Sequence, residues 1–582
     1  MARRQSSETL RRPQSVLRIL FPIFAAAALL LGYHGLGQFV PRHDDMGHRP
    51  IDLIYYDLQL FVLGADPLQT PGPYPRLLEV ARFLAPAVTL YAIVEAARML
   101  FSVEISRIRA RHSTGHAIVC GDTTFAQALS RRLQADHIDV IEIRNEVDEF
   151  VTTGEPLRII GDARDPEVLK AAGVAHAETV YACAAGSAAN VAIALAVGRV
   201  RTHRREELSV YSHIPDADLC ATFQATFLGR PKPGGVNIDF FNIDHIAARR
   251  LFVEYPLLPV LNRAPRLLIA GVDGFGAAIV VEAARLWRIA DPLGRHQLPI
   301  TVAGEAAGPV IGGLIQRYPF LQRVCEFTIR DADLLPLLAD GLLIEPPDRA
   351  LICYPDEEYA LKTAMTAERL WRGTSDSITV RLDGLATFLD DRDSPVPGPL
   401  SRGTRLLQID PGAVRAFGVI GAASDPALIS EDLLERLAHV IHDHYMLGRR
   451  RRGEWSDDDS SLQPWENLSP RLRSANRSAA EDIGRKLASI DCLIIPRFGP
   501  DREVTLADAD IDFLARLEHE RWCDEYERAG WRYSLQRDEE QKLHPGLRPW
   551  SSLPETFRRR SAEPIRELSV ILADAGFRIV RV

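Results

Sequence analysis

Two long apolar segments stand near the beginning of the chain. The first, Ile19 to Val40, contains only Tyr33 and His34 as ionisable residues, and it is long enough to cross a bilayer core of about 30 Å. The second, Leu77 to Val103, has a helical apolar pattern that four charged residues interrupt: Glu79, Arg82, Glu95 and Arg98. The pattern predicts two membrane helices, at 19–40 and 77–103. A cleaved signal peptide for the first and a buried soluble helix for the second are the alternatives.

Arginines flank both apolar segments. Those before the first segment are Arg3, Arg4, Arg11, Arg12 and Arg18, and those at or after the end of the second include Arg98, Arg107, Arg109 and Arg111. Basic residues beside membrane helices stay on the cytoplasmic side. We therefore expect a transmembrane region at 1–110 with both ends inside the plasma (inner) membrane, followed by a large cytoplasmic C-terminal region.

After Arg111 the pattern changes to short apolar strands that alternate with amphipathic helices. "HAIVCGDTTFAQALSRRLQADHIDVIEI" is a strand, a turn at Gly121, a helix and a second strand, and "LRIIGDARDPEVLKAAGVAHAETVYACA" continues the alternation. A second series begins at Arg266 with "RLLIAGVDGFGAAIVVEAARLW". This alternation predicts parallel sheets with helices on both faces. The fold class is therefore multidomain, with two α/β Rossmann-like domains at 115–226 and 264–392.

The rest of the chain is mainly helical and contains an internal repeat. It follows a segment rich in Pro, Gly and Ser, predicted as a linker at 393–415. "PWENLSPRLRSANRSAAEDIGRKLASIDCLI" aligns without a gap with "PWSSLPETFRRRSAEPIRELSVILADAGFRI", and a helix with a His and an aromatic residue precedes each copy (His442 and Tyr445; His519 and Trp522). The repeat predicts a duplicated helical module within a domain at 416–582, with copies at 438–494 and 514–580.

Composition and charge narrow the functional classes. A chain of 582 residues is too long for a single core, so several domains are expected. The net charge of −9 gives no overall attraction to nucleic acid. The seven cysteines form no CxxC pair, which favours a reducing compartment over a disulfide framework or a zinc site. We also find no arrangement of a nucleophile with a base and no metal-ligand spacing, so an enzyme is not expected.

The stretch "GDARDPEVLKAAGVAHAETVYACAAGSAANVAIAL" resembles the RCK domains (KTN, or TrkA-N-like) that regulate potassium channels and transporters. The positions that carry the resemblance are Gly161, Asp162, Asp165, Leu169, Ala172, Gly173 and Asn190. Tandem RCK folds commonly assemble into rings beneath a membrane pore. The resemblance therefore implies a homo-oligomer, a dimer or a tetramer ring, with a nucleotide or dinucleotide as candidate regulatory ligand.

Glycine turns mark the candidate nucleotide sites of these domains. The candidate residues are Gly271, Gly274, Gly276 and Glu305 in the second domain, and Gly121 and Asp162 in the first. In the first domain Arg144 stands where the family has its ribose-binding acid, and Glu142 should share a face with it. The alternatives are a structural, dimerising role for the first domain and tight helix–sheet packing at the second turn.

The C-terminal region resembles the RyR domain, the repeat named from ryanodine receptors that also occurs in bacterial proteins. The best match is "EHERWCDEYERAGWRYSLQRDEEQKLHPGLRPWSSLPE". Aromatic faces beside basic side chains suit a planar anionic ligand, and the resemblance implies a nucleotide-derived signal. The candidate pocket residues are His519, Trp522, Trp531, Tyr533, Arg537, Lys542, His544, Trp550, Trp465, Asn476 and Arg477. The alternative is that the rings form a core between helices and the basic residues face solvent.

Between the apolar segments, "YYDLQLFVLGADP" has the position and the helical start of a reentrant pore segment, at 53–67. In potassium channels a filter of backbone carbonyls follows such a helix, and the nearest match here is Val62, Leu63, Gly64, Ala65 and Asp66, without a second glycine. We expect a ligand-gated, channel-like membrane protein that passes potassium or other cations. A nonconducting membrane-anchored receptor that recruits a partner is the alternative, and a dehydrogenase-like enzyme would need a catalytic residue that we do not find.

Overall fold

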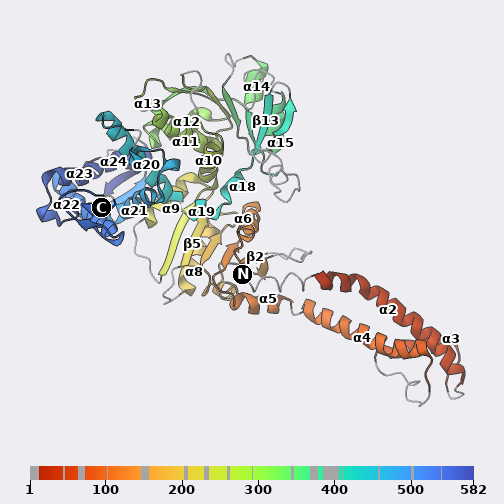
Figure 1. The fold of residues 1–582 in the computed structure, drawn as a ribbon. Coiled ribbons are helices and arrows are strands. Elements are labelled where there is room, and N and C mark those ends of the chain that lie inside the picture. The colour runs from red at the N-terminus through yellow and green to blue at the C-terminus, as the bar shows by residue number, and fades with distance from the viewer. Residues whose placement is uncertain are drawn as a thin grey trace. The chain divides into compact units, whose positions relative to one another are not determined.

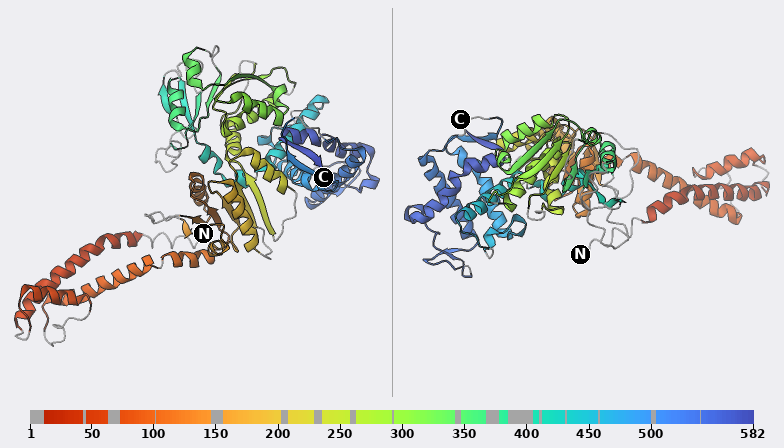
Figure 2. Two further views of the ribbon diagram at one scale, coloured as in Figure 1. Left: turned by 180° about the vertical axis from the view of Figure 1, so that it is seen from behind. Right: turned by 90° about the horizontal axis from the view of Figure 1, so that it is seen from above.

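The chain divides at residue 108 into two units, Met1–Ile108 and Arg109–Val582. The computed structural model describes residues 12–42, 46–62, 73–100, 102–145, 156–201, 208–228, 235–257, 263–291, 293–341, 347–366, 378–384, 405–409, 412–430, 432–456, 459–499, 504–538 and 540–582. Figures 1 and 2 show the elements of each unit.

The apolar segments form an antiparallel pair of helices. The helical elements in this part of the chain are α2 (Arg12–Phe39), η1 (Val40–Arg42), α3 (Pro50–Leu60), α4 (Arg76–Leu100) and α5 (Ser102–Arg111). Phe21 contacts Tyr91 at one end of the pair and Phe39 contacts Tyr74 at the other, with ring centroids 5.4 Å apart in both cases. The start of α2 therefore lies beside the end of α4, and α3 packs against both helices (Figure 1).

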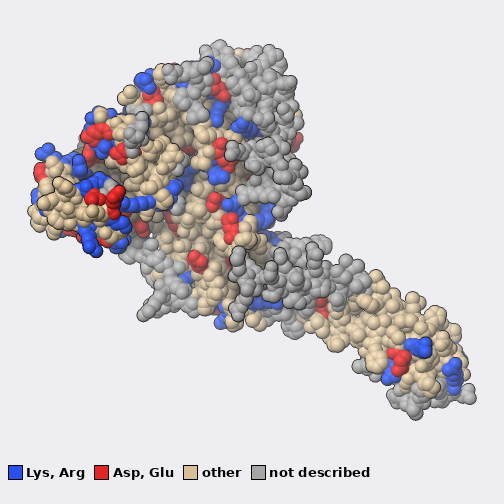
Figure 3. Space-filling view, in the orientation of Figure 1, with Lys and Arg blue, Asp and Glu red and all other residues tan. Residues whose placement is uncertain are grey.

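Both long helices could span a membrane by length and composition. The qualifying stretches are Phe21–Arg42 and Arg76–Ala97. Large apolar side chains face outward from them, including Phe83 and Leu90, which are 68% and 64% exposed. Figure 3 shows that the visible surface of this unit is mostly uncharged. Apolar surface of this extent on the outside of a helix pair suits lipid rather than water, which supports membrane association.

The predicted pore segment is only partly described. Its first half is the helix α3, which lies between the two long helices in the chain. Val62 follows α3 and is exposed. The remaining positions of the candidate filter, Leu63, Gly64, Ala65 and Asp66, lie outside the described residues.

Close packing of α2 on α4 depends on Gly35. A Cβ added there would lie 2.6 Å from the backbone nitrogen of Leu78, so the Gly35→Leu substitution should push the helices apart and cost about 2 kcal/mol or more. Gly37 is the matched control, because a Cβ there would meet no described atom within 4 Å. The measurement is the fraction of full-length protein that stays monodisperse in detergent after heating. Equal losses for Gly35→Leu and Gly37→Leu would contradict this packing.

The first α/β series folds into a six-stranded parallel sheet of strand order β3-β2-β1-β4-β5-β6. Its elements are β1 (Ala117–Cys120), α6 (Thr124–Ala135), β2 (Val140–Arg144), β3 (Leu157–Ile160), α7 (Pro166–Ala171), β4 (Thr179–Ala182), α8 (Ser187–Val200), β5 (Leu208–His213), α9 (Ala217–Phe227), β6 (Val236–Phe241) and α10 (Ile243–Glu254). Helices cover both faces, and apolar strand residues form a separate core on each side. The order is that of a Rossmann fold, and β6 extends the sheet past residue 226, where the sequence predicts the domain to end.

The second series forms a seven-stranded sheet of order β12-β13-β11-β10-β7-β8-β9. Its elements are β7 (Leu267–Ala270), α11 (Gly274–Ala290), β8 (Leu298–Ala303), α12 (Ala307–Arg317), α13 (Leu321–Val324), β9 (Cys325–Arg330), α14 (Leu334–Ala339), β10 (Arg349–Ile352), α15 (Glu357–Thr366), β11 (Ile378–Arg381), β12 (Arg405–Ile409) and β13 (Gly412–Phe417). Only β12 is antiparallel to its neighbour.

Part of the segment predicted as a linker, 393–415, is strand. β13 pairs with β11 in parallel and takes the sixth position of the Rossmann order, and β12 pairs with β13 as the outermost strand. The linker prediction is wrong for 405–409 and 412–415 because the Pro, Gly and Ser content up to residue 404 dominates the composition of the whole segment.

The two Rossmann-like domains exchange a helix. The helix after the sixth strand of the first domain, α10, places Ala247 and Leu251 in one core with Ile279 of α11. The helix after β13 is α18 (Val419–Ala423), and its Ala423 packs in one core with Phe125 of α6. Each domain therefore buries an apolar helix face of the other, which ties them together.

The C-terminal repeat domain, 416–582, is built from the two copies of the repeat. Its further elements are α19 (Pro426–Ser430), α20 (Asp432–Arg451), η4 (Ser460–Leu462), η5 (Trp465–Asn467), α21 (Pro470–Ala488), β14 (Cys492–Pro496), α22 (Asp508–Arg528), β15 (Arg532–Tyr533), β16 (Leu543–His544), η6 (Trp550–Ser552), α23 (Glu555–Arg566), α24 (Leu568–Asp574) and β17 (Phe577–Arg581). β14 pairs with β17 antiparallel, with Ile494 opposite Ile579. The sequence alignment equates these two residues, so the duplication is preserved in the fold.

Candidate functional site

The glycine turn of the first domain is held by its own polar groups. Gly121 has a φ of +125°, and a Cβ there would lie 2.6 Å from the carbonyl oxygen of Cys183, so only glycine fits. Asp122 accepts a hydrogen bond from the Asn145 backbone at 3.2 Å, and Thr123 caps α6 by accepting one from the Ala126 backbone at 3.1 Å. The turn therefore uses side chains where a phosphate-binding turn would offer glycine.

The charged residues at the end of β2 form a buried cluster of their own. Glu142 accepts hydrogen bonds from Ser130 at 2.6 Å and from Arg158 at 3.1 Å, and it pairs with Arg144 at 2.9 Å. Glu142 and Arg144 share a face, as the strand periodicity predicts. Asp162, the other candidate of this domain, is exposed and forms an ion pair with Arg164 at 2.6 Å.

The glycine turn of the second domain joins β7 to α11. Gly271 has a φ of +81°, and a Cβ there would lie 2.9 Å from the backbone nitrogen of Tyr354. A Cβ on Gly276 would overlap the carbonyl oxygen of Gly271. These two glycines let α11 pack tightly on the sheet. Gly274 begins α11, and Glu305 lies exposed just beyond the end of β8.

Most aromatic candidates of the second copy lie in one cluster. The ring centroids of Trp522 and His544 are 4.8 Å apart, and those of Trp522 and His519 are 5.8 Å apart. Trp531 is buried beside His544, and Trp550 lies next to His519. Tyr526, which the sequence analysis does not single out, lies between Trp522 and Trp531, with centroids 4.3 Å and 5.1 Å from them.

His519 and its equivalent His442 serve the architecture of the two copies. His519 Nε2 donates to the carbonyl of Arg548 at 2.8 Å, and His442 Nε2 donates to that of Gln463 at 2.8 Å. Both carbonyls directly precede a Pro-Trp pair that the alignment equates. The histidines therefore fasten each helix to its 3-10 turn.

Arginine side chains lie over the outer rings of this cluster. Arg471 lies over Tyr526 and Trp531, 4.9 Å and 4.7 Å from the centroids. Arg548 lies 4.6 Å above Tyr533, which is 44% exposed. Where guanidinium groups stack on aromatic rings, a planar ligand group can stack beside them and an anion can pair with their charge. We call these five residues the aromatic–arginine face.

The other basic candidates are separate from this stacking. Lys542 Nζ donates to the carbonyl of Ala529 at 3.0 Å, so it closes the turn after α22. The pKa of Asp459, in the first copy, lies below its usual range. The hydrogen bonds from Ser461 are the main cause, and the charges of Arg449 and of the exposed Arg537 add to it.

The candidates of the first copy gather around Glu435, away from the second-copy cluster. Trp465 Nε1 donates to Glu435 at 2.9 Å, and Arg477 binds the same carboxylate at 2.6 Å and 3.1 Å. Asn476 donates to Leu472 of its own helix at 2.9 Å. The eleven residues predicted as one pocket therefore belong to at least two places in the fold.

A cleft of about 350 Å³ lies between the first Rossmann-like domain and the repeat domain. Its walls come from α9, the edge strand β6, α20, α21 and α22. Apolar side chains such as Phe227, Leu228 and Leu433 face charged ones such as Glu481 and Arg521. The sequence analysis missed all of them, because these residues come from five distant elements and share no motif.

Two segments of this chain match the profiles of known domain families. Residues 117–224 match the profile of the TrkA-N domain, and residues 506–581 match the profile of the RyR domain. The chain carries a TrkA-N domain and a RyR domain. The RyR domain contains the aromatic cluster, and the TrkA-N domain supplies α9 to the wall of the cleft. The search of curated proteins gave no match.

Solved structures with a similar chain path include three of the GsuK channel. The structure titled "GsuK Channel" is 12% identical, with a TM-score of 0.37, and the match covers 72% of this chain and 99% of that one. One bound to ADP is 12% identical (TM-score 0.35; 72% and 99% covered), and one bound to NAD is 11% identical (TM-score 0.35; 73% and 84% covered). A similarity this weak carries no functional conclusion.

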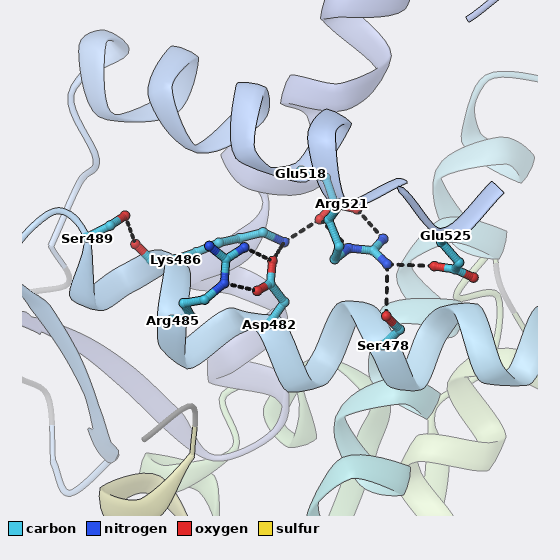
Figure 4. A network of polar contacts seen from close by, with 8 residues as sticks. All are labelled: Ser478, Asp482, Arg485, Lys486, Ser489, Glu518, Arg521 and Glu525. Carbon is cyan, nitrogen blue, oxygen red and sulfur yellow. Dashed lines mark hydrogen bonds and ion pairs between the residues drawn. The ribbon is translucent and has the colours of Figure 1, made fainter. Parts of the chain in front are cut away.

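A buried ion network joins the RyR domain to the first copy (Figure 4). Lys486 of α21, with 4% of its side chain exposed, pairs with Glu518 of α22 and, at 3.3 Å, with Asp482. Arg521 binds Glu518 at 2.6 Å and donates to Ser478 at 3.1 Å. Burial alone would raise the pKa of Glu518, but the charges of Lys486 and Arg521 outweigh it and hold the pKa below its usual range. The network borders the cleft.

A second set of ion pairs holds the repeat domain on α11. Arg285 pairs with Asp443 of α20 at 3.0 Å, and Arg288 pairs with Asp574 of α24 at 2.5 Å. His444 also contacts Asp574 at 2.6 Å. Burial alone would lower the pKa of His444, but Asp574 holds it above its usual value. The helix that starts at the second glycine turn is thus fastened to the repeat domain near its other end.

Proposed function

We propose that this protein is a ligand-regulated, channel-like membrane protein. In this proposal the RyR domain and the Rossmann-like domains sense a nucleotide-derived ligand and control an ion pathway through α2, α3 and α4. The observation that carries it is the combination in one chain of two bilayer-length helices, a short helix between them, and TrkA-N and RyR domains. The basic flanks support a cytoplasmic C-terminal region in the plasma membrane, and the tandem Rossmann-like domains, one of them a TrkA-N domain, support ring assembly of several copies.

The aromatic–arginine face, made by four residues of the RyR domain and by Arg471 of α21 in the first copy, is the ligand site that we assign. Arg471 has ring contacts but no ion pair among the described residues, so its charge is available to an anion. Arg548 is held over Tyr533 by a hydrogen bond to the tyrosine hydroxyl. A planar base could stack beside the rings while a phosphate meets the guanidinium groups. This chemistry favours a nucleotide over an uncharged metabolite.

The ion pairs described above give a physical route from this face to the rest of the unit. The repeat domain contacts α11 through Arg285 and Arg288, and it contacts α9 through Arg436, which donates to Gln224 at 2.7 Å. A ligand would shift the protein between two states only if it bound one of them more tightly. We expect ligand binding to rearrange these paired helices and so to move the Rossmann-like domains.

The test measures ligand binding and ion flux on the same preparation. Purified full-length protein is placed in potassium-loaded liposomes and exposed to a panel of nucleotides and cyclic or dinucleotide messengers. We expect one of these ligands to bind and to switch on flux. Arg471→Ala should weaken binding of that ligand at least tenfold, a loss of about 1.4 kcal/mol. Gly64→Val should abolish flux without changing binding.

Arg516→Ala is the matched control for the binding arm. Arg516 is also an exposed arginine of the repeat domain, but it pairs with Glu520 and lies over Phe513, outside the aromatic–arginine face. If a ligand binds but no ligand causes flux, the protein is a tethered receptor that recruits a partner and not a channel. If Arg516→Ala weakened binding as much as Arg471→Ala, the assignment of the ligand site to the aromatic–arginine face would be wrong.

A further inference from the structure

The first turn of α10 lies on the glycine turn of the second Rossmann-like domain. α10 follows β6 of the first domain, yet a Cβ added to Gly274 would overlap the Oδ2 atom of Asp244. Gly274 has a φ of +26° and begins α11, a helix of 17 residues. The carboxylate of one domain therefore meets the helix N-terminus of the other.

This is the place at which a Rossmann fold receives a pyrophosphate. A helix N-terminus carries partial positive charge and unpaired N–H groups, and it attracts anions. In the pattern of three glycines, the middle one lets the backbone approach the pyrophosphate, but Asp273 stands at that position here. Asp273 is the N-cap residue of α11 and makes no side-chain capping bond among the described residues. Two carboxylates therefore border the turn.

The surroundings of Asp244 keep it in position. Asn242 caps α10 by accepting a hydrogen bond from the His245 backbone at 3.1 Å, and its amide donates to the carbonyl of Ile214 at 3.0 Å. The ring of His245, the next residue along, contacts Arg436 of the repeat domain at 3.1 Å. The first turn of α10 is thus fixed to its own domain, to the repeat domain and to the second glycine turn.

The charges around Asp244 are mixed. Arg381 and Asp383 face it, and these two residues pair with each other at 3.1 Å. Burial raises the pKa of Asp244 to about 6, Arg381 opposes the rise, and Asp383 adds to it. The carboxyl therefore remains mostly ionised at neutral pH, and a phosphate brought to Gly274 would meet a like charge at contact distance.

We propose that Asp244 is an internal anion that occupies the phosphate position of the second glycine turn and closes it to nucleotides. Gly271 and Gly276 then serve packing, and the turn opens only when α10 moves. The contact is an autoinhibitory one supplied by the neighbouring domain. It goes beyond the proposed function and does not depend on whether the protein conducts ions.

The test is a gain of binding. Isothermal titration of the full-length protein in detergent, with ADP and with NAD as pyrophosphate-bearing probes, is compared for the wild type and Asp244→Asn. Removal of one negative charge at contact distance should tighten binding at the turn roughly tenfold or more. Glu254→Gln is the matched control, because Glu254 is an acid of the same helix that pairs with Arg250 far from the turn. It should leave binding unchanged.

Two further variants locate the effect. Gly274→Ala, added to Asp244→Asn, places a methyl group at the turn, against the amide that replaces the carboxylate, and should remove the gain. Arg471→Ala, added to Asp244→Asn, removes the site assigned to the aromatic–arginine face and should leave the gain intact, so that the two proposals fail separately. Unchanged affinity in a folded Asp244→Asn protein would overturn the inference. So would tight wild-type binding that Asp244→Asn weakens, because Asp244 would then be a ligand contact.

Discussion

Replacement of Lys486 by methionine is expected to destabilise the repeat domain by about 3–5 kcal/mol, the range for removal of one partner from a buried ion pair. Lys486 is nearly inaccessible, with 4% of its side chain exposed, and its ammonium group lies between Glu518 and Asp482. Methionine fills a similar volume but leaves the carboxylate of Glu518 buried with only Arg521 to balance it. The loss should separate α21 from α22, and so the two copies from each other.

The measurement is thermal unfolding of the full-length protein, followed by limited proteolysis to identify the segment that opens first. Arg485→Met is the matched control on the same helix, since Arg485 has 57% of its side chain exposed and pairs only with Asp482 among the described carboxylates. Its effect should stay below about 1 kcal/mol. The double variant Lys486→Met with Glu518→Leu should recover part of the loss. Equal effects of Lys486→Met and Arg485→Met would show that the buried network does not join the two copies.

Gly276→Ala is expected to destabilise the second Rossmann-like domain by about 3 kcal/mol or more, at or above the upper end of the range for an overpacked core. The new methyl group would overlap the carbonyl oxygen of Gly271, which is a backbone atom and cannot rotate away. It would also lie 3.5 Å from Cβ of Cys353 on the neighbouring strand end. α11 would have to move off the sheet, and its ion pairs with the repeat domain would move with it.

Gly313→Ala is expected to increase the stability of the same domain. Gly313 lies in α12, and a Cβ there would meet no described atom within 4 Å. Alanine restricts the unfolded chain and favours a helix by about 0.5–1 kcal/mol, so this variant should be slightly more stable than the wild type. Thermal unfolding of the two variants side by side tests the pair. A Gly276→Ala protein as stable as wild type would mean that α11 does not approach the sheet this closely.

Local patterns in the sequence predict much of the architecture. The alternation of apolar strands and amphipathic helices predicts both parallel sheets, because burial on two faces requires continuous apolar strands such as Leu267–Ala270. The repeat alignment predicts the two copies, and the structure places Ile494 directly opposite Ile579. The length and composition of the two apolar helices predict candidate membrane spans. Each of these signals is visible in the sequence without knowledge of which distant segments are in contact.

Other features depend on contacts between distant segments, and local patterns miss them. The segment around 405–417 looks like part of a linker, yet it completes a sheet because β11 leaves an edge on which β13 can pair. The predicted pocket mixed residues of both copies, although Arg477 and Trp465 bind Glu435, while Trp522 and His544 lie together elsewhere. Shared chemistry in the sequence did not imply shared location.

The sequence by itself determined which pieces the chain contains: two apolar helices, two Rossmann-like series and a duplicated helical module. It also determined that glycines stand at both strand–helix turns. Only the tertiary structure decided what those turns face. Asp244 reaches Gly274 across 30 positions of sequence, because α10 buries Ala247 and Leu251 in one core with Ile279 of α11. Helix exchange brings that carboxylate to the turn, and the hydrophobic periodicity within either domain does not predict the exchange.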